Sequence, residues 1–268
     1  MTETAVFLRD LLHAPAVLLS VHASKGSVPR EIGAWMAVMP HCIVGTVGGG
    51  RLEWDAISHA RTLLERPTRR GYSEDVLFKL GPRLGQCCGG EVLLRFEAVN
   101  AQDVPVLQNR LCEHRHPLAL FGGGHVGRAL VQVVGTLPFS VQWIDSRDEI
   151  FPAFVPENVQ CEHSSPVHSA VNALPAGSRV VVMSFSHAED WDIVAACLQR
   201  QRDRADLPYV GLIGSASKWA SFRHRLEHRG FTPAEVAHIR CPIGIAGIRD
   251  KRPAVIAVAI AAQLLQAM

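Results

Sequence analysis

Two rhythms of apolar and polar residues divide the chain, and the first covers residues 1–100. Apolar residues recur at helical spacing over 4–13 and over 51–66, where Pro67 ends the pattern. Shorter apolar or alternating segments predict β-strands at 16–23, 35–39, 43–47, 74–80 and 91–96. We therefore expect this half to be a small domain of mixed α and β structure, with glycine clusters at its strand ends.

The second rhythm begins at residue 117, where strand segments start to alternate regularly with helical ones. Strands are predicted at 117–121, 140–145, 179–185 and 209–214, and helices at 125–134, 189–202, 217–229 and 254–267. This alternation favours a parallel, doubly wound sheet. The predicted fold class is thus α/β, with a mixed α/β domain over 1–100, a linker over 101–116 and a Rossmann-like domain over 117–268.

Composition narrows the classes of function. The 268 residues carry a net charge of +2 and no block of like charges, so neither a nucleic-acid partner nor a polybasic membrane anchor is expected. The longest apolar stretches are shorter than the about 20 residues of a membrane span. The opening residues do not resemble a signal peptide, so we expect a cytoplasmic protein. The seven cysteines lack a repeated C-x-x-C spacing, which disfavours a disulfide scaffold or a structural zinc site.

The segment ALFGGGHVGRAL carries the strongest single motif. Gly122, Gly124 and Gly127 match G-x-G-x-x-G between an apolar strand and a helix, where such glycines permit a tight turn, close approach of a phosphate and close packing. Asp145 ends the next strand, at the position of a carboxylate that binds a ribose hydroxyl. The pattern predicts a phosphate-bearing ligand, although a purely structural turn would use the same glycines.

Further candidate ligand contacts follow other predicted strands. Gly214 ends a strand, and Ser215 or Ser217 is positioned to cap the following helix and to offer a hydroxyl group. His125 and His187 also follow strands, at the edge where parallel sheets bind ligands, and each either faces that ligand or lies on the surface. The motifs of serine hydrolases, zincins and P-loop nucleotidases are absent from the sequence.

Two adjacent cysteines, Cys87 and Cys88, stand between glycines in the segment GQCCGG. Adjacent cysteines rarely form a disulfide with each other, because the geometry is strained. Thiolates are soft ligands and nucleophiles, suited to molybdenum, copper(I) or sulfur transfer, and the glycines leave space around them. The alternative is two small residues at the start of a strand, and composition leaves both interpretations open.

Seven segments, taken in order, resemble the xanthine dehydrogenase accessory family of the XdhC and CoxI type over nearly the whole chain. They are KGSVPREIGAWM, GTVGGGRLE, GPRLGQCCGGEV, LFGGGHVGRAL, IDSRDEIFP, VGLIGSASKWASFRHRL and PIGIAGIRDKRPAVIAVAIAAQLL. The resemblance implies an accessory protein without catalytic residues, which binds the molybdenum cofactor (molybdopterin) while a cysteine desulfurase supplies sulfur. The cofactor is then inserted into an apo xanthine dehydrogenase or a related molybdenum hydroxylase, and a homodimer fits the family.

This resemblance suggests roles for the candidate residues. The glycine loop would hold the phosphate of the cofactor, and the two cysteines would approach the molybdenum. The expected cofactor-binding residues are Cys87, Cys88, Gly122, Gly123, Gly124, His125, Gly127, Asp145, His187, Gly214 and Ser215. One departure concerns His187, because a second histidine common in the family is replaced here by Glu189. The main alternative is an NAD(P)-dependent oxidoreductase built on the same Rossmann half, and a third possibility is a protein-interaction module.

Overall fold

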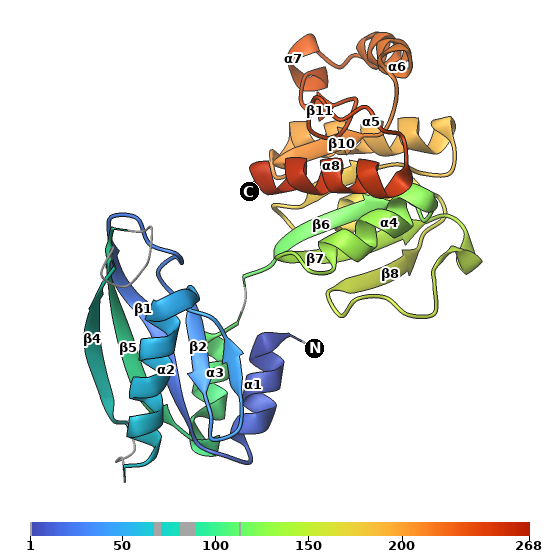
Figure 1. Cartoon of the computed structure of the whole chain (residues 1–268). Helices are drawn as coiled ribbons and strands as arrows, with labels where there is room; N and C mark the ends of the chain where they lie inside the picture. Colours follow the sequence, from blue (N-terminus) through green and yellow to red (C-terminus); the bar gives the residue numbers. More distant parts are fainter. Residues whose placement is uncertain (1, 67–70, 81–88, 113) are drawn as a thin grey trace. The chain divides into compact units, whose positions relative to one another are not determined.

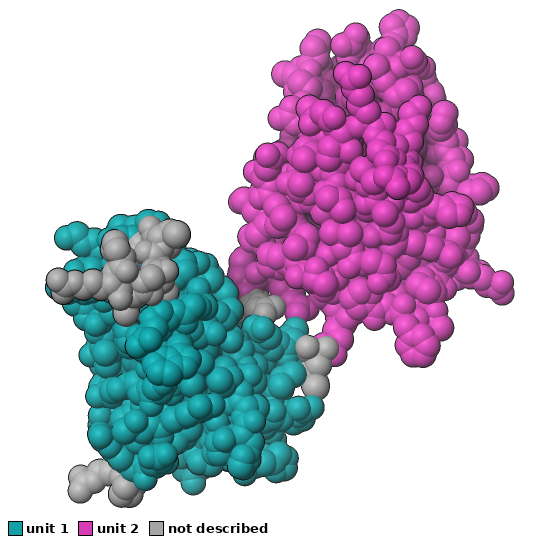
Figure 2. Space-filling view, in the orientation of Figure 1, with its two compact units in different colours: residues 1–112 teal, residues 113–268 magenta. Residues whose placement is uncertain are grey.

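The computed structural model describes residues 2–66, 71–80, 89–112 and 114–268. The chain forms two compact units, residues 1–112 and 113–268, which are coloured separately in Figure 2. Each has its own hydrophobic core. In the part of the chain that the structure describes, no helix is both long and apolar enough to cross a membrane.

The first unit is built on an antiparallel sheet of five strands in the order β3-β2-β1-β5-β4. Its strands are β1 (Ala16–Lys25), β2 (Trp35–Val38), β3 (Ile43–Gly45), β4 (Ser73–Lys79) and β5 (Glu91–Val99). Successive side chains of a strand point to opposite faces of the sheet. In β1, Val17 and Leu19 face one core, whereas Ala16 and Leu18 face the other. Both faces of the sheet therefore need helices to cover them.

Helices cover the two faces of this sheet, as Figure 1 shows. The helix α2 (Gly50–Leu64) buries Leu52, Ala56 and Ala60 against one face. The helices α1 (Glu3–Leu11) and α3 (Val104–Arg110) pack on the other face.

The segment predicted as a linker, 101–116, packs on the core of the first unit through a short helix, and a helical stretch over 104–113 is also what its sequence pattern indicates. A 3-10 turn, η2 (Ala101–Asp103), leads into α3, and Leu107 and Leu111 are buried in the core of the first unit. These two leucines stand four positions apart and lie on one helix face, which explains why the helix packs instead of spanning free space. The strand β6 then starts at His116.

The second unit is a parallel sheet of six strands in the order β11-β10-β9-β6-β7-β8. The strands are β6 (His116–Phe121), β7 (Phe139–Asp145), β8 (Val159–His163), β9 (Arg179–Val182), β10 (Tyr209–Leu212) and β11 (Ile239–Arg240). Numbered within the unit, this is the Rossmann order in which the direction of winding reverses between the first and fourth strands. The predicted fold class is confirmed.

Both faces of the parallel sheet are covered by helices (Figure 1). The helices α4 (His125–Val134) and α8 (Pro253–Gln266) pack on the face to which Leu118 and Leu120 point. The 3-10 helix η4 (Val167–Ala173), α5 (His187–Arg204) and α6 (Ala216–His228) pack on the face that carries Ala119 and Phe121. The short helix α7 (Pro233–Val236) begins with a capping box formed by Thr232 and Glu235.

Candidate functional site

The candidate site lies where β6 and β9 end, at the point where the winding of the sheet reverses. Ligands of such sheets bind at the carboxyl ends of the strands at this point. Gly122 follows β6 with a φ of 121°, and a β-carbon there would overlap the carbonyl oxygen of Met183, which follows β9. The backbone of the two loops is therefore in direct contact, and only glycine permits it.

The glycine loop divides its tasks among its residues. A β-carbon at Gly127 would overlap the carbonyl oxygen of Gly122, so Gly127 lets α4 approach the strand. The same carbonyl accepts a hydrogen bond of 3.0 Å from Trp143 Nε1. Gly124 differs, because a β-carbon there would meet no described atom within 4 Å beyond its chain neighbours. Gly124 is also the N-cap of α4 and offers no capping side chain, so the amides at the start of α4 stay available for an anion.

Asp145 is buried and bound on both carboxylate oxygens. It accepts hydrogen bonds from the amide of Gly123 at 2.6 Å and from the amide and guanidinium of Arg147 at 2.9 Å. Burial raises the pKa of Asp145, but the Arg147 guanidinium and the two amides outweigh it and hold the pKa below its ordinary value. A ribose hydroxyl would have to compete with these donors, so in this structure Asp145 positions the glycine loop and Arg147.

Arg147 connects this carboxylate to an aromatic side chain. Its guanidinium lies 4.6 Å from the ring centre of Phe185, which follows β9 and is 67% exposed. The partners of Arg147 are thus Asp145 and Phe185. Phe185 was missed because its contact with Arg147 joins two loops that are 38 positions apart in the sequence.

The first turn of α5 connects three strand ends. Glu189 accepts from Ser146 Oγ at 2.6 Å and from the amide of Phe185 at 3.2 Å, and so links the loops after β7 and β9. Asp190 accepts from the Ser184 hydroxyl at 2.7 Å and from Lys218 Nζ at 2.6 Å. Neither acidic residue was singled out from the sequence as a contact, although two carboxylates three and four positions after a capping serine are a recognisable signal.

The remaining expected residues of this unit also lie at strand ends. His125 and His187 are the exposed first residues of α4 and α5. Gly214 follows β10, and a β-carbon there would lie 2.9 Å from Lys218 Cδ and 3.4 Å from Cys241 Sγ. Ser215, rather than Ser217, caps α6 by accepting from the Lys218 amide at 3.2 Å.

Three of the sequence motifs of the first unit meet at one end of its sheet. A β-carbon at Gly90 would lie 2.5 Å from the carbonyl oxygen of Ser27, and one at Gly48 would overlap the Pro29 ring. Leu80 and Gly90 are joined by a backbone hydrogen bond of 2.8 Å. Cys87 and Cys88, which belong to the third of these motifs, lie outside the described residues. Among the described residues, no group of three or more potential ligands could hold a metal ion.

The glycine triplet Gly48–Gly50 in this unit lies beside an anion that the protein itself provides. Glu53, in the first turn of α2, accepts from the Thr46 hydroxyl at 2.6 Å and from the amides of Gly49 and Val47 at 3.0 and 3.2 Å. Burial raises the pKa of Glu53, but these donors outweigh it and lower the pKa overall. The triplet thus has a structural task, in contrast to the open Gly124.

Comparison with known proteins was made on sequence and on structure. A model of the XdhC Rossmann domain matches residues 118–264, and a model of the XdhC and CoxI family matches residues 12–73. The uncharacterized protein YqeB of Escherichia coli (strain K12) is 25% identical over 255 residues, which are 95% of this chain and 44% of YqeB. The chain thus spans less than half the length of this curated relative.

Among solved structures, a crystal structure described as a xanthine dehydrogenase from Bacillus halodurans matches with a TM-score of 0.79. Sequence identity is 19%, and the match covers 100% of this chain and 96% of that chain. At this identity the likeness shows a common fold. The Rossmann-domain model alone covers more than half of the chain, and the resemblance seen in the seven segments is confirmed. The chain belongs to the XdhC and CoxI family.

Proposed function

We propose that this protein helps a molybdenum hydroxylase of the xanthine dehydrogenase type to mature, by carrying the molybdenum cofactor as cargo. Membership of the XdhC and CoxI family supports the maturation role. The observation that carries the cargo site is the open position at Gly124, which lies at the uncapped start of α4.

The glycine loop suits the phosphate end of the cofactor. The amides at the start of α4 point out of the helix, and the helix dipole adds positive potential there. Gly124 leaves the backbone uncovered, so a phosphate oxygen is able to reach these amides. The exposed His125 next to it supplies a further hydrogen-bonding group.

Phe185 suits the flat pterin ring of the same ligand. Gly122 lies against Met183 and the amide of Ser184, so Phe185 follows directly after the contact between the two loops. Arg147 holds one side of the Phe185 ring, and the high exposure of this side chain leaves aromatic surface for stacking. A ligand with a phosphate and a planar ring would thus use both loops.

Cys87 and Cys88 are proposed to serve the sulfur chemistry of the cargo. Thiolates bind soft metals and accept or donate sulfur, and a cysteine desulfurase is the proposed sulfur source. A Cys87→Ala, Cys88→Ala double variant is expected to keep phosphate-dependent binding and to lose transfer of active, sulfurated cofactor to the apo hydroxylase. Normal transfer by this variant would exclude the thiol role.

The cargo site itself is tested with Gly124→Ala. Gly124 has an ordinary φ of −69° and open space around it, so the free protein tolerates a methyl group that would obstruct a phosphate. The purified protein is mixed with cofactor released from a molybdenum enzyme, and retained pterin is measured by fluorescence after gel filtration. We expect retention by the wild type and a loss of about tenfold or more in the variant, with an unchanged melting temperature.

The same experiment with NAD(H) and NADP(H) addresses the oxidoreductase alternative, which uses the same glycine loop. Tight nicotinamide binding without retention of pterin would overturn the proposal in favour of that alternative. Equal retention of pterin by wild type and Gly124→Ala would instead move the cargo away from the glycine loop. Plain and nucleotide-extended forms of the cofactor are tested separately, and gel filtration also reports whether the protein is the proposed homodimer.

A further inference from the structure

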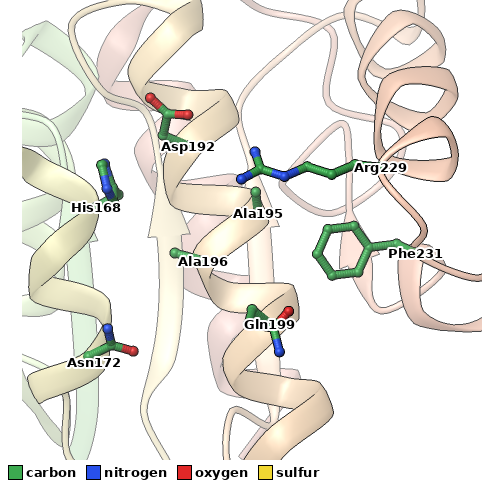
Figure 3. A pocket seen from close by; sticks show the side chains of 8 residues that line it. All are labelled: His168, Asn172, Asp192, Ala195, Ala196, Gln199, Arg229 and Phe231. Atoms are coloured by element: carbon green, nitrogen blue, oxygen red, sulfur yellow. The ribbon is translucent and has the colours of Figure 1, made fainter.

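A groove runs along the outer side of α5, on the face of the sheet opposite α4 and α8. It has a volume of about 290 Å³ and is formed by η4, by α5 and by the segment after α6 (Figure 3). The lining residues are His168, Asn172, Asp192, Ala195, Ala196, Gln199, Arg229 and Phe231. The proposed cargo function uses none of them.

The groove is lined by one carboxylate, Asp192, and one guanidinium, Arg229, and these two groups do not form an ion pair with each other. In Figure 3 the Arg229 side chain extends from its own segment toward α5, with its guanidinium on the side of Asp192. Among the residues that the structure describes, no hydrogen bond or ion pair engages the side chains of His168, Asp192 or Arg229. A guanidinium and a carboxylate that line one groove, each unpaired, present a positive and a negative binding group to the same ligand.

Neighbouring arginines show that this arrangement is not the local norm. Arg200 forms an ion pair with Asp206 at 2.7 Å, and Arg202 forms one with Glu235. Arg225 lies 4.2 Å from the ring centre of Trp191. Among the described residues, Arg229 therefore lacks the kind of partner that these three neighbouring arginines have.

The rest of the groove suits the body of a small molecule. Ala195 and Ala196 form a floor of small side chains, so a ligand is able to approach the helix closely. Phe231 supplies an apolar wall, and the Asn172 and Gln199 amides supply polar groups toward the later turns of α5. The volume is near the lower end of the range for small-molecule sites, about 300 Å³.

From this arrangement we propose that the groove binds a free α-amino acid. Its carboxylate pairs with Arg229 in the forked geometry that guanidinium groups favour, and its ammonium group pairs with Asp192. Its side chain lies over Ala195 and Ala196 toward Phe231. The site is separate from the glycine loop and goes beyond the proposed cargo function.

The test titrates the full-length protein with L-alanine, L-glutamine and L-phenylalanine up to about 10 mM, a range that covers weak metabolite binding. Heat of binding and amide chemical shifts of ¹⁵N-labelled protein are measured. We expect at least one of the three amino acids to bind. Its N-acetyl and carboxamide derivatives should each bind about tenfold more weakly or worse, because each lacks one of the two charges.

Variants assign the two charges to their residues. Arg229→Gln and Asp192→Asn should each weaken binding about tenfold or more. The control is Arg223→Gln, an exposed arginine of α6 whose distance to Glu227 is 4.0 Å, and it should bind like the wild type. Gly124→Ala should also bind like the wild type, so failure of the cargo proposal and failure of this one are distinguishable.

Three outcomes would overturn the proposal. The first is no binding of any of the three amino acids. The second is equal binding of the N-acetyl derivative, which would indicate a plain anion site. The third is normal binding by Arg229→Gln or by Asp192→Asn, which would place the ligand elsewhere.

Discussion

Single glycines in the loop after β6 have different tasks, and the space around each one reveals which. Gly127 is pressed against the carbonyl of Gly122, whereas Gly124 faces open space at the start of α4. The G-x-G-x-x-G motif assigns its second glycine to close approach of a phosphate and its third to helix packing, and the space around Gly124 and Gly127 differs in the same sense.

Gly127→Ala should therefore destabilise the second unit, because the new methyl group forces the helix away from the strand. We expect the free energy of unfolding to fall by about 2 kcal/mol, the usual cost of overpacking. Gly124→Ala should change it by less than about 0.5 kcal/mol. Urea unfolding monitored by circular dichroism measures both, and equal effects of the two substitutions would contradict this division of tasks.

Asp145 should make the free energy of unfolding depend on pH in the acidic range. Because its pKa lies below the ordinary value of 3.8 in the folded state, its contribution is present above that pH and is lost as pH falls through the folded pKa. Asp145→Asn should lower the free energy of unfolding near neutral pH by about 1–3 kcal/mol through the lost bonds to Arg147 and Gly123. Unfolding curves between neutral pH and about pH 3 should converge for wild type and variant, and a constant gap between them would contradict the assignment.

At the scale of elements, α5 acts as the connector of the strand ends. Its first turn binds the loops after β7 and β9 through Glu189, and it reaches Lys218 of α6 through Asp190. The geometry of the proposed cargo site therefore depends on how α5 is seated as well as on the glycine loop.

The substitution Lys218→Met tests how much the ion pair between Lys218 and Asp190 contributes to the free energy of unfolding. The Lys218 and Asp190 side chains are only 11% and 4% exposed, so removal of the lysine leaves a buried carboxylate without its counter-ion. We expect a loss of about 3 kcal/mol in the free energy of unfolding. An added Asp190→Asn should recover part of it, and the control Lys251→Met, on an exposed segment of the same unit, should have little effect. A loss no larger than that of the control would show that the pair is unimportant.

Sequence patterns predicted most elements but not the edges of the second sheet. The helix α4 has the predicted bounds, because the glycine loop fixes its start. The strands β8 and β11 were not predicted: β8 buries only Val159 fully, and β11 has two residues. An edge strand with so little apolar content is defined by hydrogen bonds to its neighbour, which the sequence does not reveal.

The candidate site could be predicted only in part for a related reason. Glycine spacing identified the loop after β6, since that signal is local. The contact of Arg147 with Phe185, the bond of Glu189 to Ser146 and the bond of Asp190 to Lys218 join segments that are distant in sequence. They depend on the order of strands in the sheet, which no local pattern specifies.

At the scale of the whole molecule, each unit encloses its own apolar residues, and the cysteines of the described part differ in accessibility. Cys42 is exposed, whereas burial raises the pKa of Cys197 to about 12 and that of Cys241 to about 11. Only the thiolate form reacts readily with alkylating reagents. The fold therefore protects the buried thiol of Cys197 and, in part, the half-buried thiol of Cys241.

Alkylation of the native protein by iodoacetamide near neutral pH should follow this order. Cys42 should be labelled rapidly, and Cys197 and Cys241 only after unfolding, as peptide mass spectrometry would show. Labelling of Cys241 before Cys42 would contradict the assignment. The same peptide map reports on Cys87 and Cys88, and rapid labelling there would support their proposed role in sulfur chemistry.

The carboxylate of Glu53, which accepts from the amides of Val47 and Gly49, shows that a glycine-rich turn can hold a negative charge from its own chain. A glycine-rich loop is able to bind a negatively charged group through its backbone amides. The glycines alone do not reveal whether that group is a side chain of the protein or a ligand. In the loop before α2, the Glu53 carboxylate binds the backbone amides. In the loop after β6, Gly124 faces open space. Among glycine-rich loops, those whose amides already bind a carboxylate of the same protein are therefore poor candidates for a ligand site.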